Sequence, residues 1–157
     1  MQDRLRRQDK RRKFHWLSPS DPAYPVFTLL KSYMTALIID TSAATGYVAL
    51  AKTGQIVRST TLPQGRELSK LLFASIVDTL SEEKIEFIAI GTGPGSFTGT
   101  RVGVTTAQAL AYGWVIPLVP FASSLLPDLP LIAKTTHLLF LQDDIPAITL
   151  EYFSKTP

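Results

Sequence analysis

The stretch IGTGPGSFTGTRVG, Ile90 to Gly103, follows an apolar segment and leads into a run with helical spacing. It contains five glycines, one proline and a single charged residue, Arg101. A loop of this composition between a strand and a helix either cradles a phosphate or lets another part of the backbone approach closely. The choice between these two roles decides how the surrounding chain is interpreted.

Neither specific phosphate-binding motif is present. A P-loop requires G-x-x-x-x-G-K-[ST], but no lysine lies between Glu86 and Val119. A dinucleotide fingerprint requires G-x-G-x-x-G, and position 96 is serine. A weaker anion site at the helix N-terminus stays open as an alternative. Its candidate ligand residues are Asp40, Gly93, Gly95, Ser96, Thr98 and Arg101.

A row of small residues runs along the helix that follows the loop. Gly99, Gly103, Ala107 and Ala111 recur every four residues and share one face. Glycine inside a helix costs about 1 kcal/mol relative to alanine, so two in one row indicate that close approach is required. The row packs either on the domain's own sheet or against another chain.

The preceding helix, expected over Arg66–Glu83, has more apolar surface than one sheet can cover. Its apolar residues sweep an arc of roughly 240°, whereas a surface helix needs little more than about 100°. The surplus predicts a contact with a further helix or chain. The predicted interface residues of the two helices are Leu68, Leu71, Leu72, Ile76, Gly99, Gly103, Ala107 and Ala111.

The order of the elements predicts the fold class. Three successive strands are expected over 35–42, 46–52 and 55–62, then a helix, a buried strand over 85–91, a helix over 96–112 stopped by Gly113, and a strand over 115–121. This α/β order, β-β-β-α-β-α-β, is typical of an actin-like or Hsp70-like, ribonuclease-H-like lobe. Two further strands are expected over 137–144 and 147–153.

Composition divides the chain. Residues 1–33 carry eight Lys/Arg and three Asp, and the remainder carries eight Lys/Arg and ten Asp/Glu. We expect 1–33 to be a basic, disordered extension, with an RNA- or membrane-contacting arm as the alternative. Residues 34–126 are expected to form the lobe, and 127–157 the remnant of a truncated second lobe. Residues 102–127 are uncharged, but their polar residues and prolines favour a helix and a strand over a membrane span.

Few residues are suited to catalysis. The absence of cysteine excludes disulfides and thiolate chemistry and fits a cytoplasmic location. The two histidines, His15 and His137, form no metal-binding pair, and His137 is expected in a strand. Asp143-Asp144 is interpreted as a solvated turn. Asp40, at the end of the first strand, is the best single candidate for chemistry. We expect no catalytic residues and no metal.

Two segments together resemble a known family. MTALIIDTSAATGYVAL and GTGPGSFTGTRVGVTTAQALAYG, spaced by a short helix, resemble the TsaB (YeaZ) family of bacterial proteins for tRNA threonylcarbamoyladenosine biosynthesis. The resemblance covers roughly residues 34–126. Departures are the absence of histidine near the start of the first helix, LQDDIPAI in place of an Asp-Ala-Arg turn, and the short second lobe.

The resemblance implies a non-catalytic subunit. It would support a TsaD-like catalytic subunit, together with a TsaE-like ATPase, in modifying adenosine 37 of tRNAs that read codons starting with A. It would form a homodimer through the same two helices in the absence of a partner and would contact tRNA only through the complex. It would have no cofactor of its own, with a possible nucleotide shared at the partner interface. The alternative is an actin-like ATPase or phosphotransferase that uses Asp40.

Overall fold

Strand β1 (Thr35–Asp40) is buried at every position and lies at the centre of a five-stranded sheet. The computed structural model describes residues 33–123, 128–142 and 145–150, which belong to one compact unit. The sheet order is β3-β2-β1-β4-β5. β1 pairs antiparallel with β2 and parallel with β4, while β3 and β5 form the edges. The other strands are β2 (Gly46–Lys52), β3 (Gln55–Leu62), β4 (Phe87–Gly91) and β5 (Leu118–Phe121).

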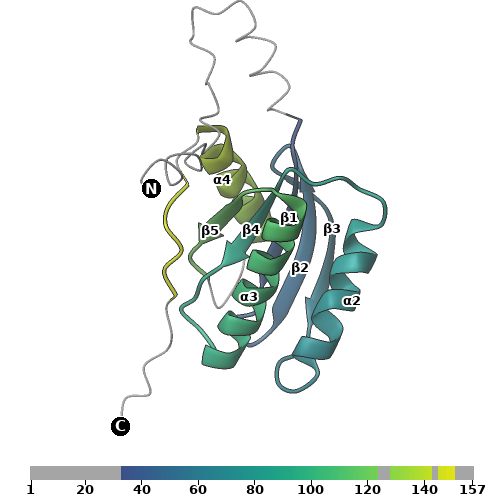
Figure 1. Ribbon diagram of the computed structural model, residues 1–157, viewed down its shortest axis with the longest axis vertical. Helices are drawn as coiled ribbons and strands as arrows, with labels where there is room; N and C mark the ends of the chain where they lie inside the picture. Colours follow the sequence, from purple (N-terminus) through teal and green to yellow (C-terminus); the bar gives the residue numbers. More distant parts are fainter. Residues whose placement is uncertain (1–32, 124–127, 143–144, 151–157) are drawn as a thin grey trace, which may run out of the picture. The chain divides into compact units, whose positions relative to one another are not determined.

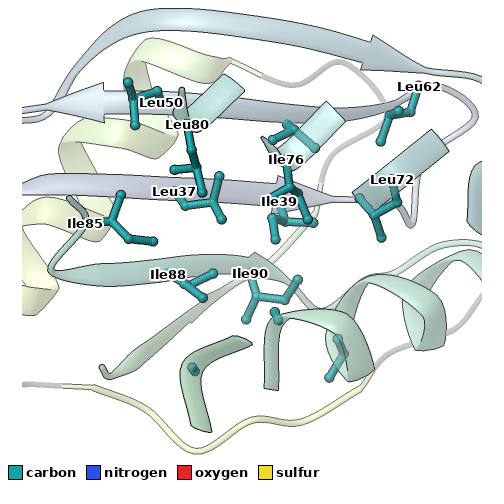
Figure 2. Packing of buried hydrophobic residues seen from close by; sticks show 14 of the residues in the cluster. Leu37, Ile39, Leu50, Leu62, Leu72, Ile76, Leu80, Ile85, Ile88 and Ile90 are labelled. Carbon is teal, nitrogen blue, oxygen red and sulfur yellow. The ribbon is translucent and has the colours of Figure 1, made fainter. Parts of the chain in front are cut away.

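Helices cover both faces of this sheet, so its central strands are apolar on both sides. Helices α2 (Leu68–Leu80) and α3 (Phe97–Trp114) lie on one face, and helix α4 (Leu129–Gln142) lies on the other (Figure 1). Leu37 and Ile39 of β1 point toward α2 and α3, as Figure 2 shows for their cluster. Ala36 and Ile38 alternate with them and pack on the α4 face.

The predicted order β-β-β-α-β-α-β is confirmed, but the expectation for residues 137–144 is wrong. Residues 137–142 belong to α4, which packs against β1, β3 and β5. The ring of Phe140 stacks on that of Phe87 with centroids 4.5 Å apart. The apolar run LLFL of this segment suits a buried helix as well as a strand, and here the helix covers the second face of the sheet. Residues 147–150 form no strand, and Asp143-Asp144 and 151–157 lie outside the described residues.

Gly113 does not stop α3 as predicted. The helix continues through Trp114 and ends where Val115 takes left-handed backbone angles, φ 56° and ψ 44°. The amide of Ile116 then donates to the carbonyl of Ala111 at 3.1 Å, as in a Schellman-type helix end. None of the helices in the described ranges is long and apolar enough to cross a bilayer.

Candidate functional site

The glycine-rich loop packs on the turn between β1 and β2. A β-carbon on Gly95 would collide with the backbone of Ser42, and one on Gly99 would collide with the carbonyl oxygen of Thr41. Two hydrogen bonds join the same segments: the Ser96 amide donates to Ser42 O at 2.7 Å, and the Thr41 hydroxyl donates to Gly99 O at 2.6 Å. The glycines therefore serve close approach of one backbone to another within this chain.

The start of α3 is capped from within the loop. The Ser96 hydroxyl accepts a hydrogen bond from the Gly99 amide at 3.2 Å, and the Thr100 amide donates to Ser96 O at 2.8 Å. On the other side of the loop, Gly93 and Ser123 exchange two bonds, from Gly93 N to Ser123 Oγ at 3.0 Å and from Ser123 N to Gly93 O at 2.7 Å. The loop is thus fixed between the β1–β2 turn and the segment after β5.

Asp40 ends β1 and is completely buried. Its Oδ1 accepts hydrogen bonds from the Ser42 amide at 2.9 Å and the Ser42 hydroxyl at 2.6 Å. Oδ2 has no hydrogen-bond partner among the described residues, and a β-carbon on Gly91 would collide with the carboxyl group. Asp40 therefore holds the β1–β2 turn in place from a fully buried position.

Tyr47 is the residue opposite Asp40 on β2, and its ring is buried in the cluster beneath α4. Burial, reinforced by the charge of Asp40, raises the pKa of the Tyr47 phenol well above its ordinary value. The phenol oxygen also lacks a hydrogen-bond partner among the described residues. This phenol is therefore neutral and takes no part in acid–base chemistry near neutral pH.

Among the predicted ligand residues, Arg101 lies apart from Asp40. Asp40 shares the sheet face of Ile38, which α4 covers, whereas Arg101 is exposed on α3 on the opposite face. The Arg101 guanidinium lies 3.8 Å from the centre of the exposed Phe97 ring. Ser96 and Thr98 are exposed, while Gly93 and Gly95 are buried. Within the described ranges, no group of three or more His, Asp or Glu side chains could hold a metal ion.

The predicted interface residues are mostly internal. Leu71 is 40% exposed, but the other seven are buried within the chain: Leu68, Leu72, Ile76, Gly99, Gly103, Ala107 and Ala111. The reason for the difference is that the end of β1 fills the space along the glycine row. The row therefore packs within the domain, on its own sheet, and not against another chain, the other alternative that the sequence leaves open.

A different set of apolar side chains faces outward on these helices. Phe73 and Val77, one helical turn apart on α2, are 59% and 51% exposed. The wide apolar arc of the sequence included both residues, but periodicity alone could not separate them from the buried leucines. No motif or spacing in the sequence identifies the partners of the loop, which are Thr41, Ser42 and Ser123.

His137 lies in α4 and is buried. Gly54, in the turn between β2 and β3, packs against its β-carbon. Burial lowers the pKa of the imidazole below its ordinary value. His15, like the rest of the basic segment 1–32, lies outside the described residues.

Comparison with known proteins agrees with this geometry. The family model described as TsaD, tRNA N6-adenosine threonylcarbamoyltransferase, matches residues 67–125. The TsaB protein of Haemophilus influenzae is 36% identical over 95 residues, 57% of this chain and 40% of the relative. The Escherichia coli TsaB protein is 35% identical over 91 residues, covering 55% and 39%. The chain thus spans about two fifths of the length of these curated relatives.

Solved structures show the same fold. YeaZ from Pseudomonas aeruginosa superposes with a TM-score of 0.52 at 31% identity, over 57% of this chain and 44% of that one. RuvC from T. thermophilus superposes with a TM-score of 0.50 at 8% identity, over 71% and 95%, which supports the fold alone.

The central strand, the antiparallel edge formed by β2 and β3, and the helices on both faces define an actin-like, ribonuclease-H-like lobe. Within that class, the glycine loop and the similarity to curated TsaB proteins are specific. The similarity to the curated TsaB proteins and to the YeaZ structure supports the TsaB (YeaZ) family for this lobe.

Proposed function

We propose that this chain is a non-catalytic subunit in the synthesis of N6-threonylcarbamoyladenosine at position 37 of tRNAs that read codons starting with A. It would support a TsaD-like catalytic subunit, assisted by a TsaE-like ATPase, and would contact tRNA through that complex. The proposal rests on the similarity to a curated TsaB protein over 95 residues and on the match of the TsaD family model to residues 67–125, which include the glycine loop and both helices of one sheet face. We also propose that the protein is cytoplasmic.

The internal packing of the loop supports a role without catalysis. Backbone atoms of the β1–β2 turn occupy the space in front of Gly95 and Gly99, where a phosphate would otherwise approach. We therefore assign no cofactor to this chain alone and place a shared nucleotide, as part of the proposal, at the interface with the partner.

The exposed apolar residues of α2 are the proposed contact with the partner. Phe73 and Val77 project from the same helix whose other face builds the core. Exposed aromatic and aliphatic side chains of this kind anchor protein interfaces. In the absence of the TsaD-like subunit, a second copy of this chain would cover the same residues and form a homodimer.

The test is a titration of the full chain with the TsaD-like protein of the same cell, followed by calorimetry. Phe73→Asp and Val77→Asp are expected to weaken binding about tenfold or more, because each places a charge in an apolar contact. Leu131→Asp is the matched control, since Leu131 is equally exposed (58%) but lies on α4, on the other face of the sheet. Equal affinity of all four proteins would contradict the proposed interface.

The cellular test is the threonylcarbamoyladenosine content of tRNA, measured by nucleoside mass spectrometry after depletion of the chain. We expect the modification to fall and the exposed-face variants to restore it poorly. Unchanged modification after depletion would overturn the proposal.

The alternative is an ATPase or phosphotransferase that uses Asp40, whose Oδ2 is unpartnered among the described residues. Its burial behind Gly91 counts against that role. Steady ATP hydrolysis by the purified chain, abolished by Asp40→Asn, would favour this alternative over the subunit role.

A further inference from the structure

We draw no further inference here: the strongest candidate, the largely apolar pocket of about 310 Å³ at the C-terminal ends of α2 and α3, lined in part by Ile85, Trp114 and Ile116, carries none, because nothing in the structure shows what covers it.

Discussion

Gly103 lies directly against Thr41: a β-carbon at Gly103 would come closer than 3.0 Å to the Thr41 hydroxyl oxygen. The same hydroxyl donates a hydrogen bond to Gly99 O, one helical turn earlier. Helix α3 therefore rests directly on Thr41 at the end of β1, and the Gln64 side chain donates to the Thr41 carbonyl oxygen at 3.2 Å beside this contact. This close packing is possible because Gly99 and Gly103 have no β-carbon.

Gly103→Leu is expected to destabilise the folded domain, because the new side chain has no space beside Thr41. Overpacking of this kind typically costs about 1–3 kcal/mol in the free energy of unfolding. Urea denaturation followed by circular dichroism measures it. An unchanged denaturation midpoint would show that α3 moves away from β1 at no cost.

Gly113→Ala is the matched change in the same helix and should have the opposite sign. Nothing lies within 4 Å of a β-carbon at Gly113, and the residue is in the helical part of α3. Alanine there should stabilise the domain by about 0.5–1 kcal/mol. Loss of stability would mean that the C-terminal turn of α3 is not helical in solution.

The fold could be predicted because its strands and helices have strong local patterns. TALIID and FIAIG are short apolar runs between polar turns, and each became a central strand. The prediction of a strand over 137–144 was wrong because its apolar run, LLFL, is short and uninterrupted. A run of that kind suits a buried strand or a buried helix equally. The need to cover the second sheet face, a tertiary requirement, made it helical.

The site was harder to predict than the fold. A row of glycines indicates close approach but does not identify the approaching group, and here it is Thr41, fifty-eight residues before Gly99. The leucines of α2 and the exposed Phe73 belong to one continuous apolar arc in the sequence. Only the position of the sheet separates the side that forms the core from the side that is free to bind.

Leu72 and Phe73 should therefore respond differently to the same substitution. Leu72 is 1% exposed, so Leu72→Asp buries an unpaired charge and should unfold the domain or cost several kcal/mol, more than the roughly 2–5 kcal/mol of a leucine-to-alanine change. Phe73→Asp should stay within about 0.5 kcal/mol of the parent. Thermal unfolding of both variants decides it, and similar melting temperatures would contradict the described orientation of α2.

Val115→Gly should raise stability, since glycine adopts left-handed angles without the steric penalty of a β-branched side chain. The expected gain is about 1 kcal/mol, offset in part by the greater freedom of glycine in the unfolded chain. Val115→Ala, which has a β-carbon and keeps the penalty, is the control. A melting temperature that falls for both variants would show that the Val115 side chain contributes packing, and one that falls for glycine alone would contradict the predicted relief of the backbone.

His137 should make the stability of the domain depend on pH. Burial lowers its pKa in the folded state below the ordinary value of 6.5, so the unfolded chain binds the proton more readily. Stability from this group is therefore complete above about pH 6.5 and is lost as the pH falls toward the folded-state pKa. The proton would have to be accommodated where α4 packs on the turn at Gly54.

The measurement is the denaturation midpoint of the parent and of His137→Gln at pH 7.5 and at pH 5.5. Glutamine cannot be protonated, so the variant should lose less stability than the parent over this interval, although carboxylate titration affects both proteins alike. His15 is present in both and cancels in the comparison. If the two proteins lose equal stability, α4 is released from the sheet before His137 is protonated, and the imidazole titrates in water as it does in the unfolded chain.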